Sequence, residues 1–223
     1  MVAGAVVLTW FVVAPHLGHL RLWPAVLLVS LAIIPGTLAP ALIALPLWSK
    51  RWLFVAAIVL ALVALGCSEA GWGLPANFAK LWAAIFAGWS FLRLFEELSW
   101  VVIVALVIPL VDTLSVWRGP THSITQHHFG AYKAVAIAFL VPGGGAAYLG
   151  PPDILFYALF LGAAQRWHLR VGWTWAATTG MYALTVIVAT AAGISGLPAL
   201  PFLSFGFLAA NGDLLWRRLR PTR

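Results

Sequence analysis

Apolar runs close to the length of a transmembrane helix follow one another along almost the whole chain, and short polar junctions separate them. An α-helix needs about 20 residues to cross the hydrocarbon core of a bilayer. The runs predict helices at residues 2–18, 22–47, 52–68, 78–95, 98–117, 150–168, 172–193 and 197–216. We therefore expect an all-α polytopic membrane protein with about eight transmembrane helices, and with no fewer than seven and no more than nine.

The first two runs need separate comment. No basic segment precedes the first run, and no clear small-residue cleavage site follows it, so we expect a retained helix and not a signal peptide. The second run, 22–47, is longer than one span requires and contains four prolines. Because proline kinks or breaks a helix, we expect this run to be tilted, kinked at Pro35-Gly36, or broken into a pair of helices.

The stretch 118–149 interrupts the helical pattern. Its first half is polar, and its apolar piece, 134–141, is too short to span before Pro142 and three glycines stop it. Irregular backbone at membrane depth is tolerated only where protein or a water-filled cavity covers it. We expect a strand or a re-entrant segment at 134–141. The polar half contains three histidines without convincing metal-ligand spacing, which favours a solvated loop: His122, His127 and His128.

Composition agrees with the apolar runs. Hydrophobic residues make up 63% of the chain and charged residues 9%, whereas a soluble domain has about 25% charged residues. The single cysteine, Cys67, excludes an intramolecular disulfide framework, and no metal site is expected. Many tryptophans lie near the ends of the runs, where they are typical of membrane interfaces: Trp23, Trp48, Trp52, Trp100, Trp117, Trp167, Trp173 and Trp216.

The net charge of +7 comes from basic residues at the ends of the runs, so it indicates topology and not nucleic-acid binding. With eight helices, one face collects nine basic residues: Lys50, Arg51, Arg93, Arg166, Arg170, Arg217, Arg218, Arg220 and Arg223. The other face has four: Arg21, Lys80, Arg118 and Lys133. The positive-inside rule then predicts an integral, multi-pass membrane protein with both termini in the cytoplasm.

Two aspartates are the sharpest chemical feature. Asp112 lies about twelve residues after Trp100, roughly 18 Å into its helix, and caps no helix. Because an ionised aspartate near the bilayer centre costs about 2.5–3.5 kcal/mol on insertion scales, it should be protonated, paired or functional. Asp153 follows Gly150 and two prolines, which predicts a helix start with this aspartate as N-cap. The two carboxyls lie on separate helices and can meet inside a bundle.

A third signal is Pro198-Ala199-Leu200-Pro201 at the head of the last run. Two prolines around Ala-Leu restrict this backbone to extended conformations and leave groups without helical partners. The segment predicts either an ordinary proline-started helix or an extended piece that pairs with the backbone of another chain.

These three signals, in this order, resemble the presenilin and signal peptide peptidase family of GxGD-type intramembrane aspartyl proteases, in a compact, prokaryotic-like form. The resemblance covers residues 98–216 and includes DILFYALFLGAA and LPALPFLSFGFLAANGD. The N-terminal half shares only hydropathy with the family. The resemblance implies one integral membrane domain in a presenilin-like bundle, with scaffold helices at 1–97 and a catalytic half at 98–223.

Carried over residue by residue, the resemblance makes Asp112 and Asp153 the catalytic pair of the Tyr-Asp and Gly-x-Gly-Asp motifs. It places Pro198, Ala199 and Leu200 on the Pro-Ala-Leu motif, and these residues together with Gly150 would bind substrate. The chain departs from the family at two positions. Val111 replaces the tyrosine, which removes a hydroxyl beside the site, and Pro152 replaces the glycine directly before the second aspartate.

The implied activity is hydrolysis of peptide bonds within or near transmembrane segments or signal peptides. One ionised carboxyl would take a proton from a water that attacks the scissile carbonyl, and the protonated one would hydrogen-bond the carbonyl oxygen. Either aspartate can play either part, and no cofactor is needed. Two alternatives stay open: a non-catalytic relative that binds transmembrane helices, favoured by Pro152, and a transporter or channel that uses the aspartates as a proton or cation relay. The oligomeric state stays open too.

Overall fold

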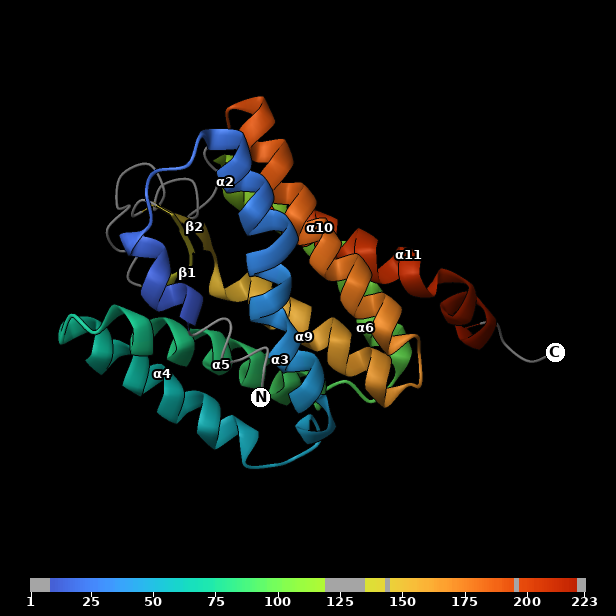
Figure 1. The fold of residues 1–223 in the computed structure, drawn as a ribbon. Helices are drawn as coiled ribbons and strands as arrows, with labels where there is room; N and C mark the ends of the chain where they lie inside the picture. Colours follow the sequence, from blue (N-terminus) through green and yellow to red (C-terminus); the bar gives the residue numbers. More distant parts are fainter. Residues whose placement is uncertain (1–8, 119–134, 143–144, 195–196, 220–223) are drawn as a thin grey trace.

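The computed structural model describes residues 9–118, 135–142, 145–194 and 197–219. The described chain is mostly helical, and a single two-stranded hairpin lies beside the start of the central helix (Figure 1). Each predicted apolar run from 22–47 onward coincides with helix, which confirms the mostly helical character. In the part of the chain that the structure describes, three helices are long and apolar enough to cross a membrane: Leu22–Leu47, Leu98–Ser115 and Val171–Ala192.

The N-terminal region forms two helical pieces. Residues 9–13 are helical and end in the 3-10 turn η1, Ala14–His16. The run 22–47 is one continuous helical stretch and not a broken pair. It consists of α2 (Leu22–Leu28), the π-helical turn η2 (Val29–Ile33), α3 (Ile34–Ala44) and the 3-10 turn η3 (Leu45–Leu47). The wide π turn lies directly before Pro35, so it accommodates the proline without ending the helix.

The next helices are α4 (Leu53–Glu69) and α5 (Gly73–Leu92), which pack against each other as a hairpin. The predicted start of α5 at residue 78 was wrong, because the helix begins at Gly73. Pro75 lies in its first turn, where the missing N–H of proline costs no hydrogen bond. α6 (Leu98–Arg118) then runs through Pro109. The hydroxyl of Thr113 donates a 2.7 Å hydrogen bond to the Pro109 carbonyl inside this helix.

The expected strand within 134–141 is present. β1 (Ile137–Val141) pairs antiparallel with β2 (Gly145–Leu149), and Ile137 lies opposite Leu149. The outer edge of β1 is covered by side chains from two helices. Asn77 of α5 accepts the Ala138 N–H at 2.6 Å and donates to the Ala138 carbonyl at 2.9 Å. The indole N–H of Trp10 donates to the Leu140 carbonyl at 3.1 Å.

The C-terminal helices are α9 (Pro151–Arg166), α10 (Val171–Ala192) and α11 (Leu200–Leu219). α9 is the centre of the bundle, because every residue from 157 to 164 is buried. Helices α5, α6, α10 and α11 contact it (Figure 1). Gly88 of α5 allows the closest approach: a Cβ there would lie 2.3 Å from the backbone oxygen of Leu155. Such small-residue contacts are typical of helix packing in membranes.

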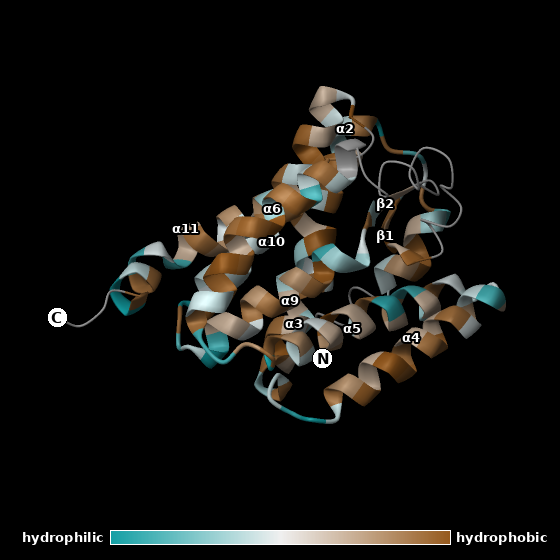
Figure 2. Ribbon diagram, turned by 180° about the vertical axis from the view of Figure 1, so that it is seen from behind, coloured by the Kyte–Doolittle hydropathy of each residue, from teal (hydrophilic) through white to brown (hydrophobic). Residues whose placement is uncertain are grey.

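The outside of the bundle is apolar. Large aliphatic side chains are exposed along α4 and α6, and Figure 2 shows hydrophobic residues on the outer faces of these helices. On α4 they include Val55, Val59 and Leu62, and on α6 Leu106, Leu110 and Leu114. A water-soluble monomer rarely exposes a continuous apolar surface of this kind. This surface agrees with the three candidate spans and suits a protein surrounded by lipid.

Candidate active site

Asp112 lies on α6, partly buried, and contacts the start of the last helix. Its Oδ2 accepts a 3.1 Å hydrogen bond from the backbone N–H of Leu200, the first residue of α11. The first N–H groups of a helix have no partner within that helix. Asp112 therefore satisfies one of them from a different helix. The expectation that Asp112 caps no helix was wrong, because its partner lies far along the chain.

Asp153 is the third residue of α9, and Gly150 is the N-cap. The Gly150 N–H donates to Asp153 Oδ2 at 3.1 Å, and the Asp153 N–H donates to the Gly150 carbonyl at 3.1 Å. The prediction of a helix start at this point is confirmed, but the predicted N-cap residue was wrong. Pro151 and Pro152 fill the first two helical positions, which is where proline fits, so Asp153 reaches back to the cap from the third.

The bundle brings the two aspartates together. Asp112 and Asp153 are close enough to interact electrostatically, although they come from different helices and stand on opposite sides of the hairpin in the sequence. Two carboxyls in apolar surroundings do not readily both carry charge, so such a pair favours holding one proton between them. In such a pair the protonated carboxyl can act as an acid and the ionised carboxyl as a base.

Tyr182 of α10 is the third polar side chain at this place, and the sequence reasoning missed it. Its side chain is fully buried and interacts electrostatically with both Asp153 and Asp112. Its ring packs against Tyr157, one turn beyond Asp153 on α9, with 6.1 Å between the ring centroids. The available signal was a tyrosine inside an apolar run, in a chain with only four tyrosines.

The Pro-Ala-Leu segment lies next to Asp112. Pro198, Ala199 and Leu200 are all buried, and Leu200 provides the N–H that bonds the carboxyl. Residues 197–199 are not helical, whereas Leu200 and Pro201 already belong to α11. Both interpretations of this motif therefore hold in part: the helix is proline-started, and a short non-helical piece precedes it.

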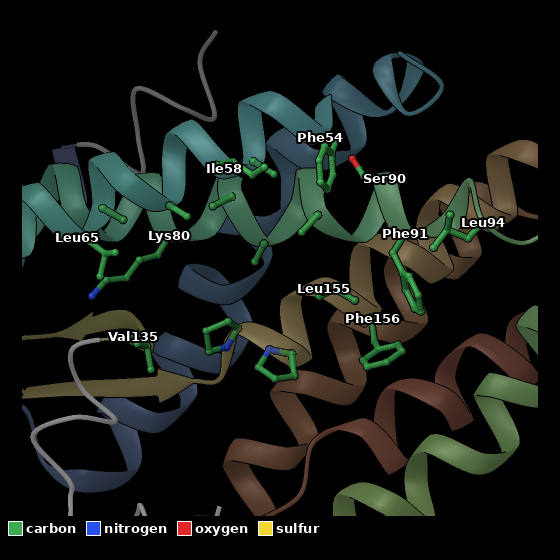
Figure 3. A pocket seen from close by; sticks show the side chains of 18 residues that line it. Phe54, Ile58, Leu65, Lys80, Ser90, Phe91, Leu94, Val135, Leu155 and Phe156 are labelled. Atoms are coloured by element: carbon green, nitrogen blue, oxygen red, sulfur yellow. The ribbon is translucent and has the colours of Figure 1, made fainter. Parts of the chain in front are cut away.

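The side chains of Val111 and Pro152, where the chain departs from the motifs that it resembles, are both exposed. Val111 is 51% exposed on the outside of α6. Pro152 is exposed at the rim of an apolar cavity of about 840 Å³ between α4, α5 and the start of α9. Figure 3 shows Ile58, Lys80 and Leu155 among the side chains that line this cavity. Within the described backbone, no residue from 150 to 152 has positive φ, so this turn does not use the freedom of glycine.

Another group of polar side chains with described contacts lies where the start of α10 meets the end of α11. Arg170 and Asp213 form a two-pronged ion pair, with both N–O distances at 2.7 Å, where α10 begins and α11 nears its end. Asn211 is buried beside them and donates to the Thr174 hydroxyl at 2.8 Å. In the described part of the chain, no group of three or more His, Cys, Asp or Glu side chains could hold a metal ion. His122, His127 and His128 lie outside the described residues.

No protein-family profile matches this chain, and no curated protein or solved structure matches it either.

Proposed function

We propose that the chain is an intramembrane aspartyl protease that hydrolyses peptide bonds within or near transmembrane segments or signal peptides. One observation carries the proposal: α6 and α9 contact each other inside the bundle, and each carries an aspartate whose carboxyl accepts a backbone N–H at the start of a helix. Carboxylates inside a membrane protein are costly and mark functional sites by default. The sequence resemblance of residues 98–216 supplies the reaction class, and Gly150, Pro198, Ala199 and Leu200 supply the neighbouring substrate contacts.

The chemistry follows from a pair that shares one proton. The ionised carboxyl removes a proton from water as the water oxygen attacks the scissile carbonyl carbon. The protonated carboxyl stabilises the developing oxyanion by a hydrogen bond. When the C–N bond breaks, a proton passes to the leaving nitrogen, and the products are a carboxyl and an amine. Water supplies every atom that is added, so the step needs no cofactor.

A substrate helix must open before its carbonyl can be attacked, because helical hydrogen bonds hold it. The outer edge of β1 is already bonded to Asn77 and Trp10. β2 ends at Leu149, directly before the Gly150 cap of the helix that carries Asp153. We therefore assign main-chain pairing with the opened substrate to β2 and to the non-helical residues 197–199. A substrate-bound structure in which neither segment contacts substrate would remove this assignment.

The membrane arrangement is part of the same proposal. The three candidate spans and the further apolar helices would cross the bilayer about eight times, with residues 1–97 as scaffold and 98–223 as the catalytic half. The excess of basic residues on one face supports a cytoplasmic C-terminus. Lipid and single-span helices are the expected partners.

A second candidate is a helix-binding protein without catalysis. It is favoured because both carboxyls accept hydrogen bonds from helix N-termini, a structural role that needs no reaction. The choice of substitution separates the two candidates. Asparagine has a side-chain oxygen that accepts the same N–H but cannot exchange a proton, whereas alanine loses both properties.

The test is cleavage of a single-span peptide by the purified protein in liposomes, with Asp112→Asn, Asp112→Ala, Asp153→Asn and Asp153→Ala beside the wild type. Proteolysis predicts that wild type cleaves, that all four variants lose at least about 100-fold in rate, and that the asparagine variants stay folded. Wild-type protein that binds a panel of substrate helices and cleaves none supports the binding protein. Aspartate-dependent ion flux without cleavage would move the function to transport.

A further inference from the structure

The hydroxyl of Tyr182 is a buried polar group without a protein partner. The side chain is fully buried in α10, and its oxygen has no hydrogen-bond partner among the described residues. Nearly all buried polar atoms in folded proteins are hydrogen-bonded, and leaving one unpaired costs free energy. Other buried side-chain atoms among the described residues are unpaired too, the Tyr157 hydroxyl among them, so it is the position of the Tyr182 hydroxyl that indicates a role.

The position of Tyr182 indicates which role. Asp153 and Tyr157 are four residues apart on α9 and lie on the same face of that helix. The Tyr182 ring packs against Tyr157, at an angle of 40°. The Tyr182 ring thus packs on the residue that lies one helical turn beyond Asp153, and the charges of Asp153 and Asp112 act on its hydroxyl.

No other charged group competes for this hydroxyl in the described residues. α2, η2 and α3, which pack on α10, contain no Asp, Glu, Lys, Arg, His, Cys or Tyr. α11 has its charges near its far end, at Asp213, Arg217 and Arg218, and Asp213 is bonded to Arg170. From α9, Asp153 and Tyr157 face Tyr182, and from α6 Asp112 does.

The neighbours of Asp112 on α6 offer no hydroxyl to the site. Val111 is apolar and half-exposed, and the Thr113 hydroxyl is already bonded to the Pro109 carbonyl. Tyr182 also forms no direct hydrogen bond with either carboxyl. A polar pair that interacts beyond hydrogen-bond distance is commonly bridged by water, and a buried water needs two to four polar partners. The hydroxyl and the two carboxyls supply them.

We propose that Tyr182 is a positioning residue of the site, resting on the protease function proposed above. Its hydroxyl donates a hydrogen bond to a water that Asp153 also binds, and it holds that water in place for attack. The contact acts on the water and not on the substrate. Loss of the hydroxyl should therefore reduce the rate of the chemical step and leave substrate binding unchanged.

The test compares Tyr182→Phe with Tyr157→Phe, which removes the same atom from a neighbouring buried tyrosine. The Tyr157 hydroxyl is oriented toward Thr179, so this variant reports the structural cost of losing a buried tyrosine hydroxyl from the same cluster. For Tyr182→Phe we expect kcat to fall about tenfold or more with KM unchanged. The acidic limb of its pH profile should move up by roughly half a pH unit, because a water that Tyr182 no longer holds hydrogen-bonds the ionised Asp153 carboxylate less well. Tyr157→Phe should keep the wild-type KM and profile.

A second measurement does not depend on cleavage. The infrared difference spectrum between wild type and Asp153→Asn identifies the carboxyl band of Asp153, because this band is absent from the variant. We expect this band to change frequency in Tyr182→Phe and to stay in place in Tyr157→Phe. An unchanged band, or equal changes in both tyrosine variants, overturns the proposal, as does a raised KM with wild-type kcat. If wild type cleaves nothing, the proposed function fails, and the band alone decides whether Tyr182 shares a water with Asp153.

Discussion

The backbone N–H of Leu200 donates a 3.1 Å hydrogen bond to Asp112 Oδ2, and this bond fastens the start of α11 to the middle of α6. The two residues are 88 positions apart in the sequence. The Pro-Ala-Leu segment and the first aspartate therefore cannot move independently while this bond is intact. A change in the protonation of Asp112 should therefore alter the conformation of residues 197–199, and a change in that conformation should alter the protonation of Asp112.

The bond predicts different stabilities for two variants of Asp112. Asparagine retains an oxygen for the Leu200 N–H, whereas alanine leaves that donor without a partner, which costs about 1–3 kcal/mol. We expect Asp112→Ala to unfold at a clearly lower temperature than Asp112→Asn, with neither variant cleaving substrate. Thermal unfolding in detergent, followed by circular dichroism, measures the difference. Equal midpoints for the two variants would argue against the hydrogen bond.

Pro152 gives a prediction about activity. Its ring lies at the rim of the apolar cavity beside the head of α9, and under the proposed function it would narrow the approach of a substrate backbone to Asp153. Pro152→Gly should raise the cleavage rate several-fold by removing this ring, and should lower stability by about 0.4–1 kcal/mol because the unfolded chain gains freedom. Pro75→Gly is the control, because Pro75 is an exposed proline in the first turn of α5 and does not line this cavity; it should show a similar loss of stability and no gain in rate. A rate that falls in Pro152→Gly and not in Pro75→Gly would show that the rigid turn before Asp153 is needed.

Asn77 gives a prediction about the hairpin. It satisfies both backbone groups of Ala138, so Asn77→Ala leaves a donor and an acceptor unpaired at the outer edge of β1. We expect a loss of about 2 kcal/mol or more in the free energy of unfolding, and slower cleavage because β2 is paired to the loosened strand. Asn77→Asp keeps the acceptor for the Ala138 N–H, so its free energy of unfolding should lie between those of the wild type and Asn77→Ala. Hydrogen exchange of the hairpin amides would locate the effect; wild-type protection in Asn77→Ala would contradict it.

Gly88 tests the packing of the central helix. Any side chain there would meet the Leu155 backbone, so Gly88→Ala must push α5 away from α9. We expect about 2 kcal/mol or more of destabilisation, within the range for overpacked cores. Gly180→Ala is the matched control in another long helix, because nothing lies within 4 Å of the added atom. That variant should be neutral or slightly stabilising. Midpoints of thermal unfolding for the two variants, measured side by side, decide the matter.

The sequence predicts what depends on local pattern. Apolar runs locate the helices because burial in lipid needs continuous apolar length, and the short run at 134–141 indicates the strand because it cannot span. The sequence does not predict details such as the π turn before Pro35 or the start of α5 at Gly73, because a proline is compatible with several helix boundaries. Such ends are decided by neighbouring helices and not by composition.

Long-range relationships could not be predicted in the same way. The cap that Asp112 provides to Leu200 joins distant segments, and only the packing of α6 on α11 reveals it. Tyr182 reads as one polar aromatic residue in an apolar run until α9 places Asp153 beside it. The pairing of the two aspartates is a prediction of the sequence, because isolated carboxyls in apolar helices need each other or another partner, and the contact between α6 and α9 agrees with it.

The shortness of α9 has a consequence for the surrounding membrane. Its 16 residues extend about 24 Å, less than the roughly 30 Å thickness of a typical hydrocarbon core. In the membrane arrangement proposed above, the hairpin would occupy the depth that this helix leaves unfilled, and Asp153 would lie near the junction of the two. A bilayer with longer acyl chains would then press lipid against the hairpin, whereas a thinner one would bring water nearer to the carboxyls. In that arrangement, membrane thickness would set the hydration of the aspartate pair.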